Sequence, residues 1–252
     1  MIENSVIGRD FSAAAAAYDV HAHLQKQARA HCLALAREIF PDSAKILDVG
    51  AGTGAFAGES KQWDITQLDL ALGMCQKATQ HGLAINADAA ALPFMDEHFD
   101  GIFSSLMLQW ANEPKRVFQE MLRVLKPAGR VVLSTLAQGT LLELHESFAG
   151  VDDAPRVNRF LSAPQIVAQA VHAGFMVLSV EEVTITEHYP DAVSLMRALK
   201  AIGATNKQTN RKKGLMTPEQ LEKLEKLYKK RFSTKKGLPA TWKLLYLMME
   251  KK

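Results

Sequence analysis

The 252-residue chain has only two cysteines, Cys32 and Cys75, and their spacing matches no metal-ligand pattern. We therefore expect free thiols in a reducing cytoplasm. His21 and His23 are two residues apart, so on a helix they face different directions, and we expect no metal site. No apolar run approaches the roughly 20 residues of a membrane span, and no basic segment followed by an apolar one opens the sequence. These absences predict a cytoplasmic protein without a signal peptide or a transmembrane helix.

Acidic residues are scarce only at the end of the chain. The net charge is +3, but residues 1–194 contain 14 Lys and Arg against 23 Asp and Glu, a net of −9. Residues 195–252 contain 16 against 4, a net of +12. This asymmetry fits a basic surface for an anionic partner, and it also fits a solvated helical face. Nucleic acid is a poor partner, because the clusters at 211–213 and 229–231 lack interleaved aromatic residues.

Short apolar runs alternate with helical patterns through most of the sequence. The runs predict strands at 45–49, 64–70, 83–87, 99–106, 130–136 and 177–185. Helical periods occur at 25–40, 71–81 and 115–125, with two more between 140 and 175. The alternation predicts a doubly wound α/β fold with a mostly parallel sheet and helices on both faces. We expect a seven-stranded sheet, with one strand in addition to these six runs.

The ends of the chain are expected to add helical elements to this one domain, 1–252. From residue 190 onward the pattern is helical and basic, with breaks near 206–214 and 233–239. We predict an N-terminal helical element and a C-terminal basic helical lid. Residues 40–136 would form the cofactor-binding core, and residues 137–252 the substrate-binding and lid elements.

A glycine cluster follows the first predicted strand. Gly50, Gly52 and Gly54 let the chain leave that strand in a tight turn and let a ligand approach the backbone. Their Gly-x-Gly-x-Gly spacing differs from the Gly-x-Gly-x-x-Gly of a pyrophosphate-binding turn. Asp48, inside the strand, would repel a diphosphate but suits a cationic ligand. An NAD-dependent oxidoreductase is therefore the least favoured interpretation.

Acidic residues end the next two predicted strands. Asp69 lies 19 residues after Gly50, where a carboxylate can accept hydrogen bonds from both hydroxyls of a ribose. Asp88 lies where it could meet an adenine amino group, beside the Ala89 backbone. Three matched elements at the ends of three successive strands are much stronger evidence than a lone glycine triplet.

This set resembles the class I S-adenosylmethionine-dependent methyltransferases over about residues 40–136, including the segment 124–129. The resemblance implies that Asp48 and Gly50 face the methionine end of S-adenosylmethionine, Asp69 its ribose, and Asp88 with Ala89 its adenine. The full set that we assign to the cofactor is Asp48, Gly50, Gly52, Gly54, Asp69, Leu70, Asp88, Ala89 and Leu106. The product would be S-adenosylhomocysteine.

The rest of the sequence is similar to the malonyl-acyl-carrier-protein O-methyltransferases, nearly from end to end. The matching segments are Phe11-Ser12 with Tyr18-Asp19, then 106–110, 135–139, 143–145, 158–161 and 196–205. That resemblance implies methyl transfer to the free carboxylate of a malonyl thioester, the step that primes the pimeloyl chain in biotin synthesis. Its implied partner, acyl carrier protein, is small and acidic and would dock on the basic C-terminal region.

Candidate substrate residues follow from that resemblance and from position. A malonyl carboxylate calls for a cation, for which Arg159, Arg197 and Lys200 are candidates. We assign catalytic roles to Tyr18 and Arg197, and substrate binding to Gln109, Trp110, His145, Arg159 and Lys200. Two alternatives remain open: a methyltransferase acting on a small quinone or lipid, and a nucleic-acid-binding protein that uses the basic tail.

Overall fold

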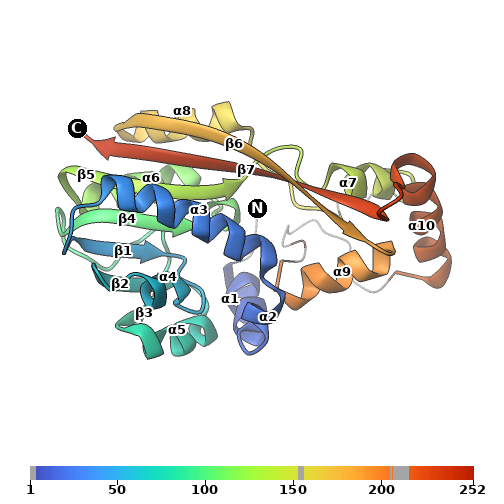
Figure 1. Ribbon diagram of the computed structural model, residues 1–252, viewed down its shortest axis with the longest axis horizontal. Helices are drawn as coiled ribbons and strands as arrows, with labels where there is room; N and C mark the ends of the chain where they lie inside the picture. Colours follow the sequence, from blue (N-terminus) through green and yellow to red (C-terminus); the bar gives the residue numbers. More distant parts are fainter. Residues whose placement is uncertain (1–3, 153–155, 205, 207–215) are drawn as a thin grey trace.

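A seven-stranded sheet with helices on both faces organises the computed structural model, which describes residues 4–152, 156–204, 206 and 216–252 (Figure 1). The strands are β1 (Lys45–Val49), β2 (Asp64–Asp69), β3 (Ala84–Asn86), β4 (Phe99–Ser105), β5 (Leu125–Leu136), β6 (Phe175–Tyr189) and β7 (Leu238–Lys251). Their order across the sheet is β3-β2-β1-β4-β5-β7-β6. Strands β1 to β5 are parallel, and β7 runs antiparallel to both β5 and β6. The predicted doubly wound, mostly parallel fold is confirmed.

Two layers of helices cover the sheet. The helices are α1 (Asn4–Ala14), α2 (Tyr18–His21), α3 (His23–Ile39), α4 (Ala55–Glu59), α5 (Leu72–Ala78), α6 (Pro114–Val124), α7 (Leu142–Ala149), α8 (Ala163–Ala173), α9 (Ala192–Ala201) and α10 (Pro218–Phe232), with short 3-10 turns η1 (Thr79–His81) and η2 (Leu108–Trp110). Helix α3 packs in one core, and α6 with α8 in the other. No helix in the described part of the chain is long and apolar enough to span a membrane.

Local sequence explains why α6 and β1 form where they do. Pro114 lies in the first turn of α6, where a missing N–H leaves no hydrogen bond unmade. Val117, Phe118 and Met121 recur on one face of α6 and are buried. Strand β1 is covered on both sides, so its last four residues are all buried. These two elements bring the end of β1 and the start of α6 to the same edge of the sheet.

The C-terminal segment corrects our expectation of a wholly helical lid. Helices α9 and α10 are present, but residues 238–251 form strand β7, which lies between β5 and β6. Both faces of β7 are covered along Leu244–Leu247, so the pattern is a continuous apolar run. Periodicity alone cannot distinguish such a run from a buried helix, which is why the prediction was wrong there.

Strands β6 and β7 continue past the end of β5. Leu136 at the end of β5 pairs with Leu244, and residues 238–243 of β7 pair only with β6. The extension carries α7, α9 and α10 at the far end of the molecule (Figure 1). Helices α1 and α2 lie near the carboxyl ends of β1 and β2, with α2 in contact with α9. The strand order reverses between β1 and β4, and open α/β sheets bind ligands beside that point.

Candidate active site

The loop after β1 forms the floor of the site. The N–H groups of Gly50 and Ala51 both donate to the Leu68 carbonyl oxygen, at 2.8 and 3.0 Å, which folds the loop back over β2. Gly50 has φ +80°, and a Cβ there would overlap the Met107 side chain. Gly52 has φ +56° and faces open space, with no atom within 4 Å of the point where a Cβ would stand. A ligand can therefore reach the backbone at Gly52.

Asp69 is held in place by the same loop. Its Oδ2 accepts the Gly52 N–H at 2.9 Å, and its Oδ1 accepts the Ala71 N–H at 2.8 Å. Burial raises the pKa of Asp69, and the backbone donors at Ala71 and Gly52 oppose that shift. A carboxylate oxygen can accept more than one hydrogen bond, so Asp69 keeps acceptor capacity for ligand hydroxyls on the cavity wall.

A cavity of about 360 Å³ opens beyond these strand ends. Its polar wall includes Gly50, Gly52, Asp69 and Asp88, and residues from the start of α6 continue it. An apolar part of the wall comes from Leu24, Leu136 and Trp242, which pack in one cluster. Ligand sites combine an apolar lining with a few fixed polar groups in this way.

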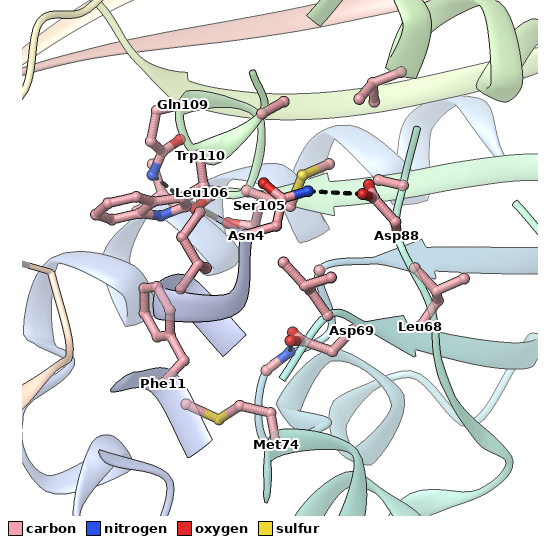
Figure 2. Close-up of a pocket in the computed structure, with 18 of the residues that line it drawn as sticks. Asn4, Phe11, Leu68, Asp69, Met74, Asp88, Ser105, Leu106, Gln109 and Trp110 are labelled. Atoms are coloured by element: carbon pink, nitrogen blue, oxygen red, sulfur yellow. Dashed lines mark hydrogen bonds between the residues drawn. The ribbon is translucent and has the colours of Figure 1, made fainter. Parts of the chain in front are cut away.

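Helix α1 covers the cavity, and hydrogen bonds of Asn4 hold the start of this helix in place. Asn4 Nδ2 donates to Asp88 Oδ2 at 2.8 Å, and Asn4 Oδ1 accepts from Asn112 Nδ2 at 3.0 Å. Figure 2 shows Asn4 and Asp88 meeting across the pocket. Phe11, further along α1, packs edge-on against Trp110 with ring centroids 5.3 Å apart. Sequence reasoning missed Asn4, because an asparagine near the start of a chain fits no motif.

Gln67 Oε1, beside Gly54, is buried without a hydrogen-bond partner among the described residues. So are Asp48 Oδ2, in β1 just before the glycine loop, and Gln25 Oε1, which belongs to a residue of the cavity wall. Asp48 is 2% exposed, and burial together with the charge of Asp69 raises its pKa to about 8 against the opposing charge of Arg29. Buried polar atoms are normally hydrogen-bonded, so the Asp48 and Gln25 oxygens are suited to a donor that a bound ligand supplies. A cationic, donor-rich ligand fits this pair of acceptors, and the methionine end of S-adenosylmethionine carries such a group.

Tyr18 contributes a protonated hydroxyl to the wall. Burial raises its pKa, and the charges of Asp69 and Asp19 raise it further, with Arg29 opposing. The Tyr18 hydroxyl therefore stays protonated at neutral pH and can donate a hydrogen bond to a ligand. Asp19 Oδ1, next in sequence, accepts from Thr53 Oγ1 at 2.8 Å and ties α2 to the glycine loop.

The predicted cofactor residues occupy three kinds of position. Those on the cavity wall are Gly50, Gly52, Asp69, Leu70, Asp88, Ala89 and Leu106. Asp48 is buried behind the loop rather than on the wall. Gly54 caps α4 and faces away, toward Gln67 and Ala78. Leu106 has φ +54°, a strained conformation for a leucine, where β4 turns into the wall.

The predicted substrate residues divide between the cavity and the surface. Gln109 and Trp110 lie on the wall. The Gln109 amide already has partners within the protein, because its Nε2 donates to the Leu106 carbonyl at 2.7 Å and its Oε1 accepts from Thr135 Oγ1 at 3.0 Å. Residues that are exposed and absent from the wall are His145, Arg159, Arg197 and Lys200. The cation that reaches the wall within the described ranges is Arg116, whose Nε donates to the Ala90 carbonyl at 2.9 Å. The roles of these residues stay predictions.

No group of three or more His, Cys, Asp or Glu side chains suited to a metal gathers in the described residues. The glycine loop after β1, the carboxylate that ends β2 and the strand order together define a class I S-adenosylmethionine-dependent methyltransferase. A family model described as "Methyltransferase domain" matches residues 47–133.

Curated relatives extend the relationship over almost the whole chain. Malonyl-[acyl-carrier protein] O-methyltransferase of Methylococcus capsulatus is 34% identical over 99% of this chain and 94% of its own length. The biotin biosynthesis bifunctional protein BioHC of Teredinibacter turnerae is 37% identical over 97% of this chain, which spans 46% of that longer protein. The chain belongs to the malonyl-[acyl-carrier protein] O-methyltransferase family.

Solved structures share the fold at low sequence identity. A SAM-dependent methyltransferase from Thermotoga maritima has a TM-score of 0.59 and 18% identity, covering 97% of this chain and 99% of that one. The [4+2]-cyclase SpnF has a TM-score of 0.58 and 20% identity, covering 90% and 82%. Since a cyclase shares the architecture, the fold alone does not decide the reaction.

Proposed function

We propose that this protein transfers a methyl group from S-adenosylmethionine to the free carboxylate of a malonyl group carried as a thioester on acyl carrier protein. The malonyl methyl ester would then prime pimeloyl and biotin synthesis. The observation that carries the proposal is the relationship to malonyl-[acyl-carrier protein] O-methyltransferase over 99% of the chain, well beyond the cofactor motifs.

The strand ends supply the cofactor's binding groups in this proposal. Asp69 accepts the ribose hydroxyls, Asp88 with Ala89 meets the adenine, and the Gly50–Gly52 backbone leaves room for the methionine end. When bound, S-adenosylmethionine supplies an electrophilic methyl group on a positively charged sulfur. Gly54 acts indirectly, since it lets α4 start close to Gln67.

The acceptor requires orientation rather than a general base. A malonyl carboxylate is ionised at pH 7, so its oxygen can attack directly. The new oxygen–carbon bond forms as the methyl–sulfur bond breaks, and the electron pair stays on sulfur. Opposite charges disappear together, so a water-excluding wall favours the reaction. Leu24, Leu136 and Trp242 provide that wall, and the Tyr18 hydroxyl is available to orient either the malonyl carboxylate or the methionine end of the cofactor.

Selectivity for malonyl over uncharged acyl groups calls for a cation beside the acceptor. We assign this role to Arg197 on α9, with Arg159 and Lys200 as the other predicted contributors. Helix α9 leads directly to Ile202 and Ala204 on the cavity wall, so the end of this helix borders the site. His145, on α7, is assigned to the same approach.

Acyl carrier protein docks on the basic C-terminal region in this proposal. Helix α10 presents Lys223, Lys226 and Lys230 to solvent. Lys226 is paired with Glu222 at 2.7 Å, whereas Lys223 and Lys230 have no carboxylate within ion-pairing distance in the described residues. An acidic carrier would complement them. The cluster Arg211-Lys212-Lys213, also predicted to dock the carrier, lies outside the described residues.

A methyl-transfer assay with labelled S-adenosylmethionine tests the proposal. Four acceptors are compared: malonyl carrier protein, acetyl carrier protein, malonyl coenzyme A and free malonate. We expect rapid base-labile methylation of malonyl carrier protein and none of acetyl carrier protein, which has no free carboxylate. Methylation of a quinone or lipid, with malonyl carrier protein inert, would reject the proposal.

A further inference from the structure

Gln25 presents an unmet acceptor to the cavity. It lies in the first turn of α3 and on the cavity wall. Its Oε1 is inaccessible to solvent and has no hydrogen-bond donor among the described residues. The amide of Gln109, on the same wall, is satisfied by Leu106 and Thr135. Since a buried acceptor without a donor is unfavourable, Gln25 is suited to a donor that arrives with a ligand.

Arg29 locates Gln25 on the glycine-loop side of the cavity. The two residues are four apart in α3 and therefore share one face of the helix. Arg29 pairs with Glu59 at the end of α4, at 2.8 Å between Nη2 and Oε1, and α4 begins directly after the glycine loop. The Arg29 charge also acts on Asp48 and on Tyr18. Gln25 thus lies on the same helix face as Arg29, whose charge acts on Asp48, and Asp48 also has an unpartnered oxygen.

The character of this region selects the ligand group. Asp69, and Asp48 once it is ionised, would repel a carboxylate there, so the malonyl group is a poor occupant. An ammonium group carries three donors and a positive charge, which satisfies an amide oxygen and a carboxylate together. Uptake of a cation also favours the ionised form of Asp48, whose pKa is about 8.

We propose that Gln25 accepts a hydrogen bond from the α-ammonium group of the cofactor's methionine end. The inference rests on the proposed use of S-adenosylmethionine and adds a binding residue that no sequence motif marks. Gln25 serves affinity and placement: it fixes the amino-acid end of the ligand while Asp69 fixes the ribose.

Calorimetry with two probes separates this role from simple packing. S-adenosylhomocysteine carries the ammonium group, whereas 5′-methylthioadenosine keeps the nucleoside and the thioether but lacks the amino-acid end. For Gln25→Met, which keeps the length of the side chain, we expect affinity for S-adenosylhomocysteine to fall about tenfold or more. Affinity for 5′-methylthioadenosine should stay at the parent value. Gln27→Met, at an exposed position of the same helix, is the matched control and should change neither.

Gln25→Glu identifies the end of the amide that matters. If Gln25 accepts from an ammonium, a carboxylate there keeps or tightens binding of S-adenosylhomocysteine. If instead its NH2 group donates to the ligand's carboxylate, Gln25→Glu weakens binding at least as much as Gln25→Met, and the inference is wrong. Equal losses for both probes would also overturn it, because they mean that Gln25 only supports the cavity.

The inference and the proposed function fail in different experiments. A parent protein that binds S-adenosylhomocysteine but leaves malonyl carrier protein unmethylated rejects the proposed acceptor and leaves the Gln25 result intact. Parent-level binding of S-adenosylhomocysteine by Gln25→Met rejects the inference and leaves the acceptor assay unaffected. Should Gln25→Met fail to fold, Gln25→Ala supplies the same comparison between the two probes.

Discussion

The two walls of the cavity are built in different ways. The cofactor wall takes Gly50, Gly52 and Asp69 from neighbouring strand ends, and backbone N–H groups hold its carboxylate. The opposite wall brings together Leu24, Leu136 and Trp242 from α3, β5 and β7, and it is apolar. The first wall therefore depends on local loop geometry, whereas the apolar wall depends on tertiary packing of distant segments.

Asp69→Ala should have the largest effect on the cofactor wall. It removes the predicted partner of the ribose hydroxyls and also the acceptor that holds the Gly52 and Ala71 N–H groups. We expect binding of S-adenosylhomocysteine to weaken by roughly 1.5–3 kcal/mol, as for hydrogen bonds to a charged group. Calorimetry measures this. Asp64→Ala, at the exposed start of the same strand, should bind like the parent, and undiminished affinity in a folded Asp69→Ala would refute the ribose placement.

Asp48→Asn should stabilise the ligand-free protein at high pH and weaken binding of S-adenosylhomocysteine. Burial holds the Asp48 pKa at about 8 in the native state, against an ordinary value of 3.8. Between these values the native state binds the extra proton, so stability falls as pH rises from about 4 to 8. Asparagine lacks this dependence. We expect the Tm of ligand-free Asp48→Asn to exceed the parent's by about 3 °C or more at pH 8.5, the shift that roughly 1 kcal/mol produces.

The same variant should bind S-adenosylhomocysteine about tenfold more weakly, because a neutral amide replaces the carboxylate that faces the cation. Differential scanning calorimetry at pH 5 and pH 8.5 provides the test of stability. Parallel Tm values for variant and parent at both pH values would mean that Asp48 does not carry the proton. Asp42→Asn, at an exposed site before β1, controls for a change of one charge.

Arg197→Met tests whether the substrate side uses a cation from α9. We predict that methyl transfer to malonyl carrier protein falls by about tenfold, typical of one charge-assisted hydrogen bond, with S-adenosylhomocysteine binding unchanged. Arg197 is exposed in the structure, so the effect requires its side chain to reach the bound substrate. Steady-state kinetics beside calorimetry separate the two readouts. Equal activity in variant and parent would clear Arg197 and transfer the role to Arg159 or Lys200.

The cofactor wall was the more predictable of the two from sequence, for a physical reason. Glycines after a buried strand and an acid at the end of the next strand are fixed by short-range geometry, so Gly50, Gly52 and Asp69 were found at the cavity. The apolar wall depends on which distant segments pack together, and no local sequence pattern predicts that Trp242 lies on the cavity wall. Strand β7 was missed for a related reason, since the continuous apolar run in its buried middle cannot be distinguished by periodicity from a buried helix.

Site residues that are marked by an unsatisfied or a long-range hydrogen bond could not be predicted from the sequence either. Gln25 becomes notable only because its oxygen is buried without a donor in the described part of the chain, and Asn4 only because α1 lies across Asp88. A position in a family motif likewise does not determine exposure, as Arg197 illustrates on the outer face of α9. Charge composition predicted a basic tail, but its ion pairs with Glu222, Glu225 and Glu146 appear only in the fold.

Charge reversal on α10 should have the smallest effect. Lys223→Glu with Lys230→Glu removes two exposed cations that have no ion pair in the described residues. Rim charges act mainly on association rate and are screened by salt, with a Debye length of about 8 Å at 0.15 M. We expect the KM for malonyl carrier protein to rise about threefold at low salt, with kcat unchanged. Kinetics over a range of salt concentrations should show a flatter salt dependence than in the parent.

Comparison with a small acceptor shows whether α10 recognises the carrier. Malonyl coenzyme A lacks the acidic protein, so its turnover should be nearly unaffected, although its phosphates could use the same lysines. Lys61→Glu, an exposed site after α4, is the matched control for Lys230→Glu and should leave the KM for the carrier at the parent value. Equal losses with both acceptors would make α10 a general part of the fold. An unchanged KM at low salt would leave α10 as a solvated surface and shift the docking role to Arg211, Lys212 and Lys213.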